Sequence, residues 1–198
     1  MINATKKQGV EFTPIEEGSY PARVYQVIHL GTYPDYVGMP KNKVRIGFEL
    51  PTEMMVFDKE KGEQPRVIST EYTLSFHEKA TLTKIIKACD PKALATDDEG
   101  FVDVYDVEKL IGKTCLVTVI HKEGKDKNVY ANVGGVTMMP KGMTCADAIN
   151  PPQILNFDSF NEEIFNKLPD FLKNKIISSD EYKSMKGVKV EDDDELAF

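Results

Sequence analysis

The sequence predicts a mainly β protein, with one small barrel followed by a short helical extension. Five stretches of the chain are predicted to be strands, and in the first three the apolar residues recur at every second position, which is the period of a half-buried strand. One stretch with the apolar spacing of an amphipathic helix lies between the third and the fourth of them. After Pro140 the alternation stops and helical spacing takes over, so we expect a second structural segment there.

The first three strands are predicted to follow one another as a meander. Residues 20–30 form the first strand, residues 44–50 the second and residues 66–74 the third. We expect the second strand to end at Pro51, because proline has no N–H to donate to a ladder. The segment 31–42 contains two glycines and two prolines and is predicted to be a loop.

A helix and two more strands complete the predicted barrel. Ser75 and Glu78 form a capping-box pattern ahead of apolar residues at helical spacing, and Pro91 is expected to stop this helix. Residues 113–121 are partly apolar on both faces and are predicted to be a well-buried fourth strand, and residues 128–138 supply the fifth.

Three strands, a helix and two strands is the order of the OB-fold, a five-stranded Greek-key barrel. That fold binds oligonucleotides over its second and third strands and over the loops that join strands one to two and four to five. Here the first loop carries Tyr33 and Tyr36, and the second, residues 121–127, carries three lysines. Gly134 and Gly135 indicate a bulge or a barrel corner in the fifth strand.

The chain is predicted to divide into four segments. They are an N-terminal arm at residues 1–17, the OB-fold domain at 18–140, a helical extension at 141–188 and a disordered acidic tail at 189–198. The helices of the extension are short and amphipathic, so we expect them to pack on the barrel, and a separate partner-binding module is the alternative. Their expected starting positions are Asp158 or Ser159, Pro169, and Ser178 or Ser179.

The composition is that of a soluble globular protein, with 41% hydrophobic and 29% charged residues. The net charge of −7 does not exclude nucleic-acid binding, because residues 191–195 hold five acids and the rest of the chain has 27 acids against 25 bases. No stretch reaches the roughly 18 apolar residues of a spanning helix, and no leader pattern is visible, so we expect a cytoplasmic protein. The three cysteines lie far apart and are interpreted as buried small hydrophobic residues.

Binding a single strand without sequence preference needs cations that follow the phosphates and flat rings on which bases stack. Candidate residues of both kinds gather on the strands and loops that an OB-fold uses. On strands one and two they are Arg23, Tyr25, His29, Lys43 and Arg45; the loops add Tyr33, Tyr36, Lys122, Lys125 and Lys127, with Tyr130 beyond them. Each position alone also fits the exposed face of any β protein, but their gathering on one predicted surface favours a nucleic-acid-binding site.

The tail joins negative charge to an apolar tip. Five acids, Glu191, Asp192, Asp193, Asp194 and Glu195, precede Leu196, Ala197 and Phe198. A pocket on a partner can hold the phenyl ring while basic residues around it bind the acids and the terminal carboxylate. A purely solubilising tail needs no such tip, so the sequence predicts that this one docks a partner.

This ending, Asp-Asp-Asp-Glu-Leu-Ala-Phe, resembles the acidic tip of bacterial single-stranded DNA-binding proteins. The body is similar to phage-encoded single-stranded DNA-binding proteins at residues 18–24, 43–50, 110–113 and 168–182. The resemblance implies binding and protection of single-stranded DNA in phage DNA replication, recombination and repair, in the cytoplasm of the bacterial host. It also implies that the tip recruits replication or recombination proteins and competes with DNA for the binding groove. The bacterial proteins stack bases on tryptophan, which this chain lacks, so tyrosines would take that role; a homo-oligomer is left open.

No enzyme is predicted. The chain shows no adjacent nucleophile and base and no phosphate-binding loop, and His29, His77 and His121 share no metal-ligand spacing with one another or with the cysteines. We therefore assign no catalytic residue, metal or cofactor. The alternative function is a phage accessory or structural protein that uses an OB barrel to hold another protein, with the tail as a DNA mimic.

Overall fold

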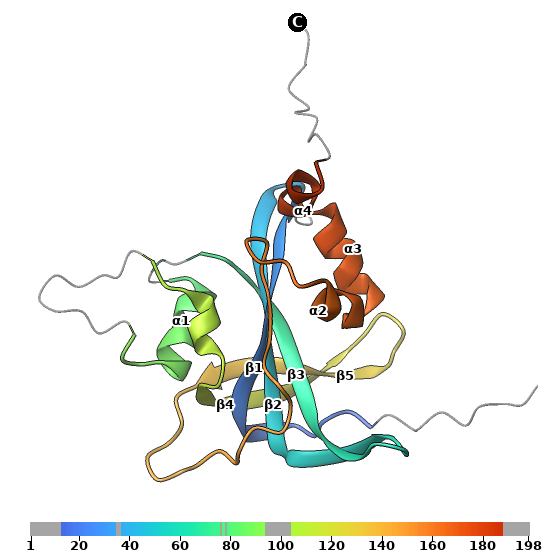
Figure 1. Ribbon diagram of the computed structural model, residues 1–198. Helices are drawn as coiled ribbons and strands as arrows, with labels where there is room; N and C mark the ends of the chain where they lie inside the picture. Colours follow the sequence, from blue (N-terminus) through green and yellow to red (C-terminus); the bar gives the residue numbers. More distant parts are fainter. Residues whose placement is uncertain (1–12, 35–36, 76, 78, 94–103, 188–198) are drawn as a thin grey trace, which may run out of the picture.

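Five long strands form one curled sheet in the computed structural model, which describes residues 13–34, 37–75, 77, 79–93 and 104–187 (Figure 1). They are β1 (Gly18–Pro34), β2 (Pro40–Asp58), β3 (Gly62–Thr73), β4 (Thr114–Glu123) and β5 (Val129–Thr137). Their order across the sheet is β3-β2-β1-β4-β5, and each neighbouring pair is antiparallel. The two end strands, β3 and β5, contact each other, so the sheet curls toward a barrel. The prediction of a mainly β protein is confirmed.

The predicted helix between the third and fourth strands is also present. It is α1 (Thr81–Cys89), and a short 3₁₀ helix, η1 (Val107–Leu110), leads into β4. After the barrel come β6 (Gln153–Leu155), α2 (Glu162–Lys167), α3 (Asp170–Ser178) and α4 (Asp180–Met185). The sequence did not predict β6, which pairs in parallel with Gln26, Val27 and Ile28 of β1.

Strands β1 and β2 are longer than predicted, so the expected loop 31–42 is wrong in extent. β1 continues to Pro34 and β2 already begins at Pro40. The expected end of the second strand at Pro51 is also wrong. The β2–β3 register shifts between Leu50 and Met54, so Pro51 lies in an irregular stretch where its missing N–H interrupts no regular ladder.

The capping box predicted for α1 is wrong, although the helix itself ends before Pro91 as expected. The N-cap residue is Ala80, which makes no side-chain hydrogen bond, and Glu78 lies outside the described residues. A turn before the helix is held instead by the Thr83 hydroxyl, which donates to the carbonyl oxygen of His77 at 2.8 Å. The bulge predicted at the glycine pair is confirmed, because Thr118 pairs with Gly135 and Val119 with Val133, which leaves Gly134 as the extra residue.

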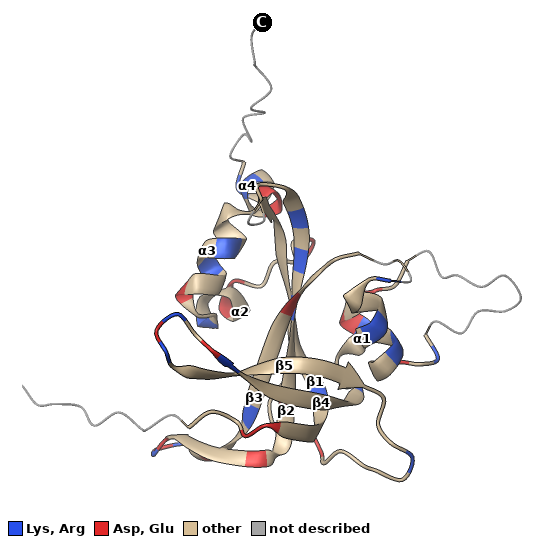
Figure 2. Ribbon diagram, turned by 180° about the vertical axis from the view of Figure 1, so that it is seen from behind, with Lys and Arg blue, Asp and Glu red and all other residues tan. Residues whose placement is uncertain are grey.

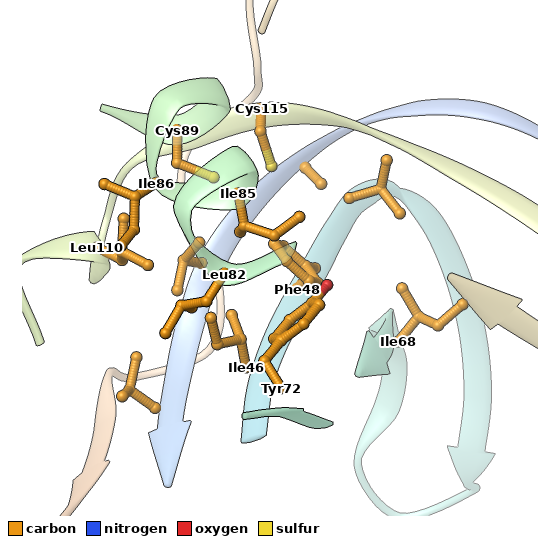
Figure 3. Close-up of a cluster of buried hydrophobic side chains, with 14 of the residues drawn as sticks. Ile46, Phe48, Ile68, Tyr72, Leu82, Ile85, Ile86, Cys89, Leu110 and Cys115 are labelled. Atoms are coloured by element: carbon orange, nitrogen blue, oxygen red, sulfur yellow. The ribbon is translucent and has the colours of Figure 1, made fainter. Parts of the chain in front are cut away.

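Buried side chains from β1, β2, β3, β4 and α1 form the core of the curled sheet, and partly buried residues of β5 pack against them. Leu82 and Ile85 of α1 point toward Phe48 on the sheet, and Ile86 lies beside Leu110 (Figure 3). Helix α1 therefore closes one end of the barrel with its apolar face, as its sequence spacing requires.

A second apolar cluster joins the C-terminal helices to the far half of β1. Its buried members are Ile28, Leu30, Leu155, Phe165, Leu168, Leu172 and Ile176. Asn161 caps α2, in place of the predicted Asp158 or Ser159, and Ser179 caps α4, which is one of the two predicted positions. The helices are therefore held against the long β1–β2 hairpin, and α4 lies at its end (Figure 1).

A carboxylate fixes α4 to this hairpin. Glu181 accepts hydrogen bonds from the Thr32 backbone N–H at 2.6 Å and from the Thr32 hydroxyl at 2.8 Å. Burial opposes ionisation of Glu181, but the hydrogen bonds from Thr32 outweigh it and lower the pKa of this carboxyl below its ordinary value. The contact links residues that are far apart in sequence and holds the extension in place.

Candidate nucleic-acid interface

Two of the predicted binding residues on β1 are engaged by the protein itself. Arg23 donates from Nη1 to the carbonyl oxygen of Gly112 at 2.9 Å and from Nη2 to that of Ala146 at 3.0 Å. His29 Nε2 lies 2.8 Å from Asn42 Oδ1, and its ring meets Phe157 edge-on, with centroids 4.9 Å apart. These side chains hold the C-terminal segment against the barrel, so the structure does not present them as free binding groups.

The third predicted residue on β1, Tyr25, lies at an irregularity in the strand. The β1–β2 register shifts between Val24 and Gln26, and Tyr25 falls between them. The ring is partly buried close to Gly47, where a Cβ would come within 3.0 Å of it. Burial is the main cause that raises the pKa of the Tyr25 hydroxyl. Only part of this ring is therefore accessible to a base.

Arg45 on β2 is covered by the C-terminal extension. Its Nη2 donates to Ser69 Oγ, and its Nη1 lies 3.8 Å from Glu71 Oε1. The guanidinium carbon lies 5.7 Å from the ring centroid of Phe171 on α3, a cation–π contact. Burial lowers the pKa of Arg45 from its ordinary value, although the nearby carboxylate opposes this.

Glu71 on β3 is the centre of the contacts beneath α3. Lys175 Nζ lies 2.7 and 2.8 Å from its two carboxylate oxygens, and the Tyr33 hydroxyl donates to Oε2 at 3.2 Å. Burial and the Glu71 charge together raise the pKa of Tyr33 to about 12. Tyr33 lies on β1 and contacts protein groups, so the loop position predicted for it is wrong. The other predicted loop tyrosine, Tyr36, lies outside the described residues.

The hairpin between β4 and β5 has a different character. Lys122, Lys125 and Lys127 are all exposed, and none of them takes part in an ion pair with another residue that the structure describes. Figure 2 shows basic segments at this turn, with acidic segments between them. Lys122 lies opposite Tyr130 in the β4–β5 register, so it belongs to the strand and not to the loop where it was predicted. Cations are therefore available for phosphates on this hairpin.

Tyr130 brings an accessible ring to the same hairpin. It is 49% exposed, and its hydroxyl donates to Asp126 Oδ2 at 2.5 Å. This hydrogen bond lowers the pKa of Asp126, together with the contacts that Asp126 receives from Asn128. One end of the ring is thus fixed by the turn, and the rest can receive a stacked base.

Two hollows follow the edge where β3 and β5 meet. The first hollow has a volume of about 670 Å³ and lies among β2, β3, the start of α1, and Val133, Gly134 and Gly135 of β5. The second hollow, of about 600 Å³, is lined by Pro14, Ile15, Val67, Ile68, Asn128, Val129, Tyr130 and Ala131. Successive stretches of the same two strands line them, and the hairpin tyrosine lies in the wall of the second.

Sequence reasoning missed most residues of these hollows. Lys43 was predicted and lines the first hollow, where its Nζ donates to Thr73 Oγ1 at 2.9 Å. Lys41 and Lys79 line the same hollow and were not predicted. The signal that could have found Lys41 is its alternation with Lys43 on one strand. Lys79 could not be found in this way, because it reaches the hollow through the turn before α1.

Metal-ligand clusters and membrane-spanning helices are both absent from the described residues. They contain no group of three His, Cys, Asp or Glu residues that could hold a metal ion. Within the same ranges, no helix combines the length and the apolar character that crossing a bilayer requires. Cys89 and Cys115 are buried, as predicted, and Cys145 is half-buried; all three are free thiols. A hydrogen bond with Cys89 and burial both raise the pKa of Cys115.

The tail residues predicted to dock a partner lie outside the described ranges, so the structure does not place Asp192, Asp193, Asp194, Glu195, Leu196 or Phe198. Comparison with protein-family models gives no match, and a search of curated proteins finds no significant relative.

Proposed function

We propose that the chain binds single-stranded DNA without sequence preference, through the β4–β5 hairpin and the adjoining edge between β3 and β5. The single observation that carries this proposal is the hairpin itself. It presents three lysines without ion-pair partners in the described structure, beside a half-exposed tyrosine at the wall of a hollow. Cations along the backbone path and a ring for stacking are what a single strand requires.

The arrangement of the strands supports an OB-type barrel as the scaffold. β1 pairs with both β2 and β4, β2 pairs with β3, β4 pairs with β5, and β3 contacts β5. A helix between the third and fourth strands fills one end. OB-folds place their ligand near the loop between strands four and five, which corresponds to the hairpin proposed here.

The proposal moves the binding surface away from β1 and from Arg45 of β2. Arg23 and His29 hold the C-terminal segment, and α3 covers Arg45 through Phe171 and Glu71 through Lys175. A strand can use these residues only after the extension is displaced. The hairpin and the β3–β5 edge need no such displacement, so we assign them the primary role.

In the cell, we propose that the protein protects single-stranded DNA during phage DNA replication and recombination. The acidic segment 191–195, with Leu196 and Phe198 after it, is proposed to recruit replication or recombination proteins. Both roles rest on the sequence resemblance, and the described residues contain no element of the tail.

The experiment is a fluorescence-anisotropy titration of the full chain with single-stranded DNA, duplex DNA and single-stranded RNA of one length, at low and high salt. The proposal expects binding to the single strands that exceeds binding to the duplex and that weakens steeply as salt rises. Equal affinity for duplex DNA, or a flat salt response, would contradict it. The same titration with the hairpin lysines replaced by glutamine tests the position of the site.

A second candidate function is a phage accessory or structural protein that holds another protein. The observation in its favour is the apolar character of the second hollow, where Val67 is 42% and Val129 is 48% exposed. Exposed apolar side chains next to a hollow also suit a protein segment. Absence of any oligonucleotide binding at low salt would favour this candidate over the first.

A further inference from the structure

The first hollow has an apolar floor and is open on the side of β5. Tyr72, Leu82 and Ile85 line it and are 8%, 2% and 4% exposed, so only a small part of each side chain can contact a ligand. On the β5 side it is lined by Gly135, where an added Cβ would have no atom within 4 Å. The volume of about 670 Å³ lies within the range of small-ligand sites in proteins.

The rim of this hollow is cationic. Lys41, Lys43 and Lys79 line it, and none of the three forms an ion pair within the residues that the structure describes. The partner recorded for Lys43 is the neutral hydroxyl of Thr73, so its positive charge is not compensated there.

The acid in the wall does not cancel these charges. Glu71 is bound by Lys175 at 2.7 and 2.8 Å and lies 3.8 Å from Arg45. Two cations, Lys175 of α3 and Arg45 of β2, therefore already balance this carboxylate. An anion that entered the hollow would meet the lysines with little opposition from Glu71.

We propose that the first hollow holds one nucleotide of the bound strand, with a phosphate at the lysine rim and the base against the apolar residues. This inference rests on the proposed function and makes it more specific. A flat aromatic base can contact the small exposed parts of Tyr72, Leu82 and Ile85, while the open side at Gly135 admits the sugar and the backbone. The two hollows follow the same two strands, so one continuous polynucleotide can contact both this site and Tyr130.

Two independent changes to the full chain test the assignment. The double change Lys41→Glu and Lys79→Glu reverses the rim charge, and Gly135→Val fills the open side without a steric clash at its Cβ. The matched control is Lys84→Glu with Lys87→Glu, which reverses two exposed lysines of α1 that do not line the hollow. Circular-dichroism melting checks that each variant folds. If Gly135→Val does not fold, the double change Lys41→Glu and Lys79→Glu still tests the site.

We expect the rim variant and Gly135→Val each to weaken binding of single-stranded DNA about tenfold or more, since one stacked base contributes roughly 1–3 kcal/mol. The control variant should change the affinity for single-stranded DNA less than about twofold, which is clearly smaller than the tenfold loss expected from one stacked base. Wild-type affinity in both hollow variants, together with weaker binding in the hairpin-lysine variant, would overturn this inference and leave the proposed function standing. If neither the hollow variants nor the hairpin-lysine variant loses affinity for single-stranded DNA, both this inference and the proposed function are contradicted.

A titration with deoxythymidine monophosphate, observed through the amide signals of Gly134 and Gly135, distinguishes a strand from a free nucleotide. If the monophosphate shifts these signals in the wild-type chain but the hollow variants bind the oligonucleotide normally, the site serves free nucleotides and the assignment to the strand is wrong. Weaker oligonucleotide binding in the same variants supports the assignment.

Discussion

Replacing the three hairpin lysines by glutamine should flatten the salt dependence of DNA binding. Lys122, Lys125 and Lys127 are exposed and have no ion-pair partners among the described residues, so each can neutralise one phosphate. For a single strand, each neutralised phosphate contributes about 0.7 to the slope of log affinity against log salt. Loss of all three should therefore reduce the slope by about 2. Between about 50 and about 200 mM salt, wild-type affinity should then fall about 20-fold more than that of the variant.

Fluorescence anisotropy with a labelled oligothymidine measures this slope directly. The control replaces Lys84, Lys87 and Lys92, three exposed lysines on or just after α1, by glutamine, which removes the same charge from another surface. The control should keep the wild-type slope. An unchanged slope in the hairpin variant, or an equal loss in both variants, would refute the placement of phosphates on the hairpin.

Three further predictions concern the ring, the extension and the tail. Tyr130→Ala should weaken oligonucleotide binding by a factor between about 5 and about 150, while Tyr130→Phe keeps the ring and should bind normally; equal losses in an anisotropy titration would assign the effect to the hydrogen bond with Asp126. Glu181→Gln should lower the free energy of unfolding in urea by about 1–3 kcal/mol. Because the folded pKa of Glu181 is below 4.5, its contribution is complete above pH 4.5 and is lost as pH falls through the folded value; identical acid sensitivity in the variant would contradict this. We propose that the five acids of residues 191–195 compete with DNA for the cationic surface; deleting residues 191–198 should therefore tighten DNA binding, and unchanged affinity by anisotropy would remove the competing role.

The barrel strands could be predicted because their alternation reflects burial on one side of the sheet. Ala22 and Val24 on β1 and Ile46 and Phe48 on β2 are fully buried at the alternate positions that the pattern assigned to the core. The continuation of β2 past Pro51 could not be predicted, because the bulge that accommodates this proline depends on the register with β3. Local pattern therefore located the strands, and pairing determined their ends.

The binding surface was less predictable for a related reason. Alternation identifies which side chains point away from the core, but not what later covers them. Arg23, His29 and Arg45 do lie outside the core. Residues of the distant C-terminal segment nevertheless contact each of them, namely Ala146, Phe157 and Phe171 in that order. Lys125 and Lys127 could be located from sequence, because they lie in the short turn between two predicted strands, whereas Lys122 lies on β4 opposite Tyr130.

The most direct measurement is a heteronuclear NMR amide spectrum of the full chain, titrated with unlabelled oligothymidine. The largest shifts are expected in the hairpin around Lys125 and Tyr130 and along the β3–β5 edge, where β3 and β5 line both hollows. Small shifts are expected around Arg23 and His29, which hold the C-terminal segment. Shifts that gather around Arg23 and His29 while the hairpin stays unchanged, or no shifts at all at low salt, would contradict the proposed interface.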